Sequence, residues 1–247
     1  MKKSLLFAIL CLAAAVAGAD GPPDADPAAM RLKAQKLYGE GNYKEAFDLY
    51  RALALDGRNE PAAAGSDMQL AASCLRTLNR DNESDEFREK FATVHSGSWQ
   101  ALFAAAQNWF AAQHYGTIIA GKFERGPHRG GGRHVNSYEH DRGRALQLMD
   151  SARAICETAA VRSGADQATR SALAAFYLEY ARMLMGYRGY QEAWRLQYLT
   201  DLAKVPDHEE GYWYGDYGYS SPKGAPADAD GNPVFHKTPS SWAAAES

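Results

Sequence analysis

The residues best suited to chemistry lie close together in the sequence HYGTIIAGKFERGPHRGGGRH, residues 114–134. Gly116, Gly121 and Lys122 have the spacing of a phosphate-binding loop, G-x-x-x-x-G-K-S/T. However, Phe123 stands where that loop needs a Ser or Thr to bind magnesium, and the preceding AAAQNWFAAQ is helix-like where an apolar strand should come first. We therefore predict an amphipathic helix over residues 115–123 and no nucleotide or other cofactor.

Histidines offer a second kind of site, because His128, His134 and His140 recur at steps of six. Zinc usually takes a more compact pair together with a third close ligand. Glu139 and Asp141 lie nearby, so a metal-dependent hydrolase stays open as an alternative. No Ser or Cys nucleophile motif is present, and the sequence DADGN near the C-terminus lacks the third acid and the distal Glu of a calcium loop. We predict that the chain is not an enzyme and holds no metal.

Positive charge is the main remaining feature of this stretch, in which Glu124 is the only acid between Lys122 and Tyr138. We interpret it as a Gly-rich basic connector whose arginines meet carboxylates or carbonyls of neighbouring parts. It is either a solvated connector or a docking surface for an acidic protein partner or an adjoining domain. The candidate interaction residues are Lys122, Arg125, His128, Arg129, Arg133 and His134.

The elements that must position these residues are helical. From Ala29 onward, apolar residues recur at helical spacing until GEGN, residues 39–42, interrupts the pattern. A second apolar stripe follows over residues 43–54 and ends at Asp56-Gly57. Two short amphipathic helices around a Gly-Asn turn form a helical hairpin.

The second of these helices resembles a tetratricopeptide repeat, in which a small residue lets the paired helices approach closely. The consensus-like positions are Gly41, Tyr43, Ala46, Tyr50 and Leu53. YQEAWRL at residues 190–196 repeats YKEAFDL at residues 43–49, and residues 74–91 read as a further, degenerate helix–turn–helix. A single repeat cannot bury its apolar face, so we expect a stack, either a right-handed α-solenoid or an irregular helical array. An irregular bundle with chance similarity is the alternative.

Further helices are predicted over residues 99–112, 138–163 and 165–185; the third is apolar around most of its circumference and should lie centrally. Strand signals are nearly absent before Pro206. The fold class is therefore all-α, a tetratricopeptide-like helical repeat domain over residues 29–204. An extended Gly/Tyr/Pro-rich, aromatic tail follows over residues 205–247. We expect this tail to pack back on the helices, with Asp207, Glu209 and Glu210 as partners of the basic stretch.

The start of the chain predicts export. Residues 1–19 have the basic end, apolar run and small-residue cleavage site of a signal peptide, and residues 20–28 form a flexible linker. The apolar run is too short to span a bilayer, so no membrane-spanning segment is expected. Removing Lys2 and Lys3 changes the net charge from -3 to -5, which does not favour nucleic-acid binding. Cys74 and Cys156 would remain, and the sequence leaves open whether they pair.

Three stretches together resemble the N-terminal region of large bacterial alpha-2-macroglobulin-like proteins. They are HYGTIIAGKFERGPHRGGGRHVNSYEHDRGRALQLM, ARMLMGYRGYQEAWRLQYLTDL and GAPADADGNPVFH. The resemblance implies a secreted or periplasmic protein whose helical, repeat-containing segment precedes β-domains that trap proteases. The family's thioester motif Cys-x-Glu-Gln is absent, since Cys74 precedes Leu-Arg-Thr and Cys156 precedes Glu-Thr-Ala.

The predicted function is thus a non-enzymatic exported scaffold that contacts protein, either neighbouring domains of the same chain or another envelope protein. The first alternative is a free-standing periplasmic repeat protein. The metal-dependent hydrolase is the second.

Overall fold

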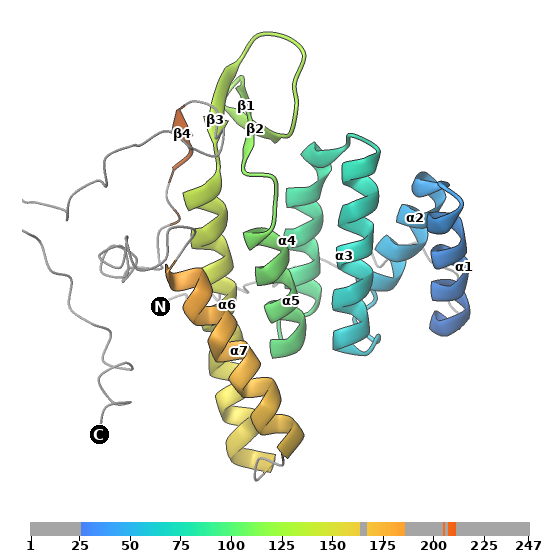
Figure 1. Ribbon diagram of the computed structural model, residues 1–247, viewed down its shortest axis with the longest axis vertical. Helices are drawn as coiled ribbons and strands as arrows, with labels where there is room; N and C mark the ends of the chain where they lie inside the picture. The colour runs from blue at the N-terminus through green and yellow to red at the C-terminus, as the bar shows by residue number, and fades with distance from the viewer. Residues whose placement is uncertain (1–25, 164–166, 186–204, 206, 211–247) are drawn as a thin grey trace, which may run out of the picture.

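The computed structural model describes residues 26–163, 167–185, 205 and 207–210. In these residues the chain is mostly helical, with a small antiparallel sheet at one end of the helices (Figure 1). The predicted signal peptide, the repeat at residues 190–196 and the aromatic tail after residue 210 lie outside the described residues.

Most helices begin and end close to the boundaries predicted from the sequence, whereas most of the helix at Pro61–Thr77 was not predicted. Asp26 and Glu60 each accept hydrogen bonds from two backbone amides of the helix that follows, and a proline occupies the first turn of both helices. The helices are α1 (Pro27–Gly39), α2 (Tyr43–Ala54), α3 (Pro61–Thr77), α4 (Ser84–Val94), α5 (Trp99–Phe110), α6 (Tyr138–Ser163) and α7 (Gln167–Met185), with a 3-10 turn at Asp81–Glu83.

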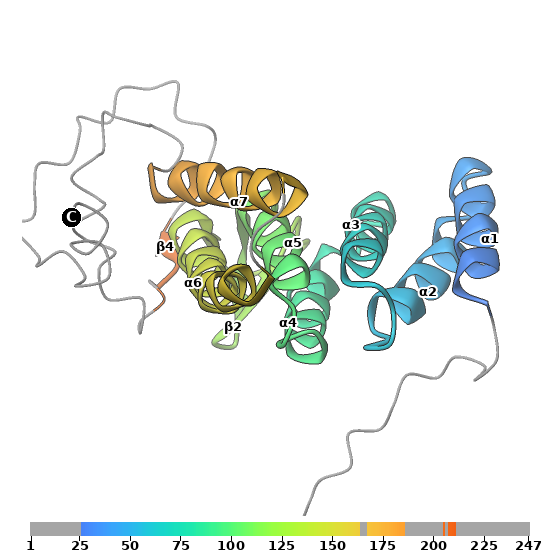
Figure 2. The ribbon, with the colours of Figure 1, turned by 90° about the horizontal axis from the view of Figure 1, so that it is seen from below.

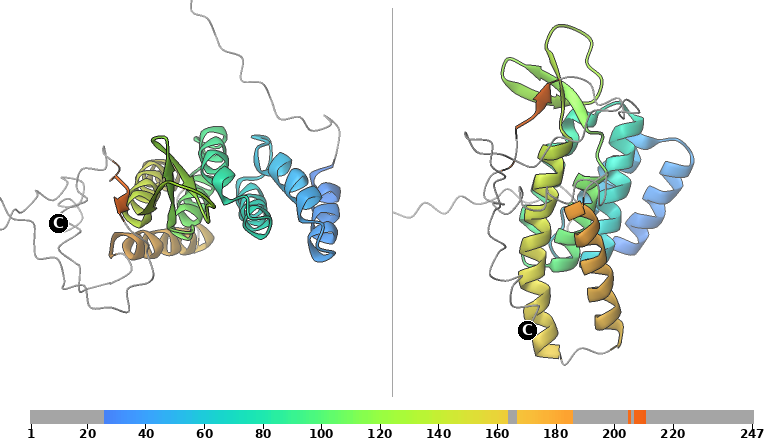
Figure 3. Two further views of the ribbon diagram at one scale, coloured as in Figure 1. Left: turned by 90° about the horizontal axis from the view of Figure 1, so that it is seen from above. Right: turned by 60° about the vertical axis from the view of Figure 1, so that its left-hand side comes forward.

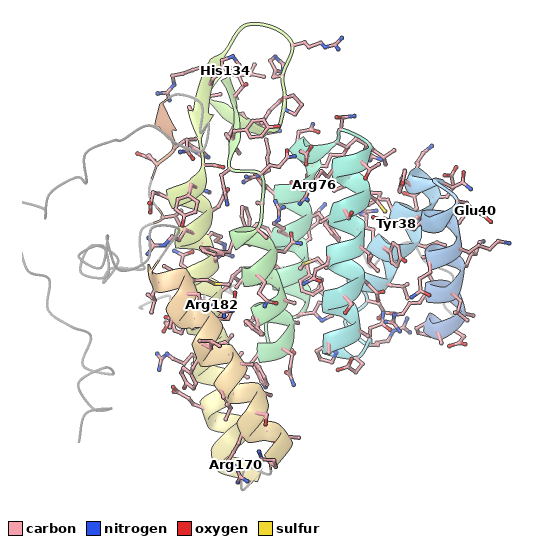
Figure 4. The ribbon with its side chains drawn as sticks, in the orientation of Figure 1. Tyr38, Glu40, Arg76, His134, Arg170 and Arg182 are labelled. Atoms are coloured by element: carbon pink, nitrogen blue, oxygen red, sulfur yellow. The ribbon has the colours of Figure 1, made fainter. Side chains whose placement is uncertain are left out.

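The helices form two layers, with α1, α3, α5 and α7 on one side and α2, α4 and α6 on the other (Figure 2). Neighbours within the first layer touch. The Tyr38 side chain of α1 reaches α3 (Figure 4), where its hydroxyl lies 3.0 Å from the hydroxyl of Ser73. Farther along the layer, the rings of Trp99 and Phe103 on α5 meet Phe176 of α7 edge to face, at 6.0 and 5.5 Å.

Small residues lie in the core between helices. Ala46 is fully buried, in agreement with its place on the predicted apolar stripe. Gly65 on α3 faces α5 so closely that an added Cβ would lie 2.7 Å from the Cβ of Ala104. The central position predicted for residues 165–185 is wrong for the described part of the molecule. There α7 is the last helix of its layer, and it leaves Leu178 56% exposed.

The predicted helix over residues 115–123 is also wrong, as is the expectation that strands are absent before Pro206. The chain forms β1 (Tyr115–Ile119), β2 (Lys122–Arg125) and β3 (Arg133–Asn136), joined by the short β4 (Glu209–Glu210). The strand order is β2-β1-β3-β4 and all pairs are antiparallel. Seen from above, the sheet lies over the ends of the neighbouring helices (Figure 3).

The turn between β1 and β2 explains the error. Ile119 pairs with Lys122, so only Ala120 and Gly121 connect the strands, and both have positive φ angles, 49° and 83°. Two such residues form the mirror-image turn that suits the twist of a hairpin. The β-branched residues before them favour a strand. The glycines that resemble a phosphate-binding loop therefore serve a hairpin.

The first turn of α6 holds the end of α7. Arg142 is buried; its Nε donates to the carbonyl of Met183 at 2.7 Å, and Nη2 donates to the carbonyl of Leu184. These carbonyls belong to the last turn of α7, where a cation is favoured by the helix dipole.

Among the described residues, Cys74 and Cys156 are both buried and are both free thiols.

Candidate functional site

The sheet and three helices meet around one arginine. Arg125, at the end of β2, has a side chain only 1% exposed. Its guanidinium donates to two carboxylates: Nε to Oδ1 of Asp85 on α4 and Nη2 to Oδ1 of Asp141 on α6, each at 2.7 Å. Nη1 also donates to Oδ2 of Asp141 at 2.7 Å and to the backbone carbonyl of Gln113. This confirms the expectation that an arginine of the basic stretch meets carboxylates and carbonyls of neighbouring parts.

Asp141 is the anionic centre of the group and its side chain is fully buried. Besides Arg125, it accepts hydrogen bonds from the Ser137 hydroxyl and from Nδ1 of His114, both at 2.8 Å. Burial alone would raise the pKa of Asp141, but hydrogen bonds from His114, His140 and Arg125 outweigh it and hold this pKa far below its usual range. Asp141 is therefore a carboxylate at neutral pH.

A second buried arginine extends the group to α4 and α5. Arg88 donates to the side chains of Asp85 at 2.7 Å, Asn108 at 2.7 Å and Ser84 at 3.0 Å. Burial and the nearby charge of Arg125 lower the pKa of Arg88 to about 10, which leaves it charged at neutral pH. We call Asp85, Arg88, His114, Arg125, Ser137 and Asp141 the Arg125 cluster.

The histidine of the Arg125 cluster has an oxygen at each ring nitrogen. Nε2 of His114 lies 3.2 Å from the carbonyl of Phe110, and Nδ1 faces the Asp141 carboxylate. Both oxygens are acceptors, so a ring nitrogen that carries a proton can donate to the oxygen it faces. The ring thereby links the last turn of α5 to the first turn of α6.

The other five candidate interaction residues differ in how far they are exposed to solvent. Lys122, Arg129 and Arg133 are exposed, whereas His128 and His134 are half-buried. His134 lies on the sheet, beyond the ends of the helices (Figure 4), and its Nδ1 is 3.1 Å from the hydroxyl of Thr117. Arg125 differs from these five residues because it is buried in the Arg125 cluster and is not exposed for contact with another protein.

A three-ring stack lies beside the Arg125 cluster. His208, just before β4, is stacked between Phe123 and His140, with ring centroids 4.3 and 4.5 Å away. The start of the tail therefore packs against the sheet, and β4 runs beside β3, which carries Arg133. The tail aromatics on which the packing prediction depended lie outside the described residues.

The described residues contain no group of three or more His, Cys, Asp or Glu side chains arranged to hold a metal ion. Of the three histidines at steps of six, His134 bonds to Thr117 and His140 stacks on His208.

Sequence reasoning missed most of the Arg125 cluster. One signal was present: Arg88 stands between Phe87 and Phe91 on an apolar helix stripe, where a charge requires a buried partner.

No protein family, curated protein or solved structure matches the chain. Over the described residues, no helix has both the length and the apolar character needed to cross a bilayer.

Proposed function

We propose that the chain is a non-enzymatic, exported helical-repeat scaffold that docks protein, and that it forms the leading segment of a macroglobulin-like protease trap. The observation that carries the proposal is the two-layer succession of helices, in which α1, α3, α5 and α7 contact one another in order. Tetratricopeptide-like solenoids have this arrangement, and their inner layer lines a surface suited to extended peptides or neighbouring domains.

The distribution of charge supports docking on α3 and α5 rather than on α2. The exposed residues of α3 are mostly uncharged, and Gln100 is the exposed residue of α5. Protein interfaces are depleted of charge at their centres. The exposed residues of α3 are Ala62, Ser66, Gln69, Arg76 and Thr77, whereas those of α2 are all charged: Lys44, Glu45, Asp48 and Arg51.

The Arg125 cluster supports a structural rather than a chemical role for the basic stretch. Its guanidinium groups and the Asp141 carboxylate are buried, Asp85 is half-buried, and these groups pair with one another. Buried pairs of this kind fix the arrangement of the elements that carry them. The cluster would hold the sheet, and with it the exposed Arg129 and Arg133, in one orientation on the helices.

Site-specific photo-crosslinking in the exporting cell tests the docking layer. A photoreactive residue would replace Gln69 or Gln100 in the first layer, with Asp48 and Glu86 in the second layer as matched exposed controls. We expect a discrete crosslinked protein adduct from the first pair and none from the second. Equal crosslinking from both layers, or none from either, would contradict the proposal. The coding frame beyond Ser247 separates the two contexts, since β-domains support the trap and a stop codon supports a free-standing repeat protein.

A further inference from the structure

Among the side chains that the structure describes, that of His208 contacts the sheet next to β4. β4 pairs with β3 over only two residues, Glu209 and Glu210. Next to it, the His208 ring is nearly parallel to Phe123 on one side, at an interplanar angle of 28°, and to His140 on the other, at 17°. A two-residue strand is a weak attachment, and the stacked histidine adds a side-chain contact that strengthens it.

The slot that receives this ring is built by the sheet. Gly116 on β1 lies beneath the Phe123 ring, and a Cβ at this position would lie 2.5 Å from Cε2 of that ring. The missing side chain lets Phe123 lie across β1 and reach His208 beyond it. His140, one residue before Asp141 on α6, forms the other wall of the slot.

The slot favours the neutral form of the histidine. Nε2 of His208 is buried with no hydrogen-bond partner among the described residues, so a proton there would have no acceptor. Charged and titratable groups face the ring from three elements: His140 and Asp141 on α6, Arg125 on β2 and Asp85 on α4. Burial and His140 lower the pKa of His208, and the two carboxylates only partly offset this.

We propose that residues 207–210 form a pH-sensitive latch, in which protonation of His208 releases β4 from β3 and opens the edge of the sheet. The direction of the pH dependence follows from the pKa of His208 in the docked and in the released state. The docked ring resists protonation, whereas the released ring titrates near the ordinary value of about 6.5. Docking is therefore fully stable above about pH 6.5 and weakens as the pH falls below it, about tenfold for each unit by which docking lowers the pKa.

Release would expose the backbone donors and acceptors of β3, next to the cationic side chain of Arg133. An open strand edge can accept another extended segment by strand addition. The latch would thus control access to the basic side of the sheet, independently of the docking layer formed by α1, α3, α5 and α7.

Hydrogen–deuterium exchange on the full chain tests the latch. Protection of the peptide covering residues 133–136 would be measured at about pH 7.5 and about pH 5, on either side of the ordinary histidine pKa. Values corrected for intrinsic exchange should fall at the lower pH in the wild type. His208→Phe keeps a ring but cannot be protonated, so its protection should stay high at both pH values, and that of His208→Ala should be low at both.

Two controls test whether the change in protection comes from His208. Protection over α2 should not change between the two pH values, which excludes general acid unfolding. His140→Phe keeps the stack and leaves His208 as the titrating group, so its loss of protection at low pH should persist. The proposal is wrong if the wild type keeps its protection at low pH. It is also wrong if His208→Phe loses protection as the wild type does, or if His140→Phe abolishes the response.

Discussion

Asp141→Asn should be among the most destabilising isosteric changes in the chain. The substitution keeps the shape of the side chain but removes the charge from a fully buried carboxylate that accepts two 2.7 Å bonds from Arg125. Breaking a buried ion pair costs about 3–5 kcal/mol, because the remaining charge has no compensation. Asp85 still contacts Arg125 in the variant, so we expect the lower end, about 3 kcal/mol, in urea unfolding near neutral pH.

The dependence on pH makes this prediction more stringent. The pKa of Asp141 is lowered in the folded protein, so its contribution to stability is complete above the unfolded value of about 3.9 and is lost as the pH falls further. The difference between wild type and Asp141→Asn should therefore shrink at about pH 3. Glu86→Gln, which removes an exposed pair with Lys90, is the matched control and should change little. A cost below about 1 kcal/mol at neutral pH, or a difference that is constant with pH, would refute the assignment of Arg125 and Asp141 as a stabilising pair.

Three further predictions concern packing and reactivity. Gly116→Ala should place a Cβ against the Phe123 ring and the Glu124 carbonyl, and cost roughly 1–3 kcal/mol in thermal or urea unfolding; an unchanged midpoint would contradict the close approach. Ala46→Leu should overpack a site that is 0% exposed and cost a similar amount, about 1–3 kcal/mol, in the same assay; an unchanged midpoint would show that the helices around α2 make room for the larger side chain. Burial raises the pKa of the Cys74 thiol to about 11, so alkylation at about pH 8 should be slow in the native protein and fast in denaturant; rapid native labelling would show that α3 opens.

The helical part of the fold was predictable because its signals are local. Gly41 marks the turn between α1 and α2, where its φ is 83°, and the apolar stripe of α2 places Ala46 and Tyr50 in the core. The α6 boundaries, Tyr138–Ser163, agree with the helix predicted over residues 138–163.

The sheet and the Arg125 cluster depend on other information. A five-residue strand such as β1 is too short to show a period of its own beside a long helical pattern. Its decisive signal, a turn with two positive φ angles, was carried by Ala-Gly rather than the more usual Asn-Gly. Arg125 contacts Asp85, 40 positions earlier in the sequence, and Asp141, 16 positions later. Local spacing does not reveal pairs so far apart.

The capping of α7 by Arg142 has a consequence for how the chain can vary. Arg142 fixes the carbonyls of Met183 and Leu184 at the first turn of α6, and His208 stacks on His140 of the same turn. The first turn of α6 therefore contacts two segments that lie far apart in the sequence, the end of α7 and the residue before β4. A substitution that displaces this turn would disturb the packing of both segments at once.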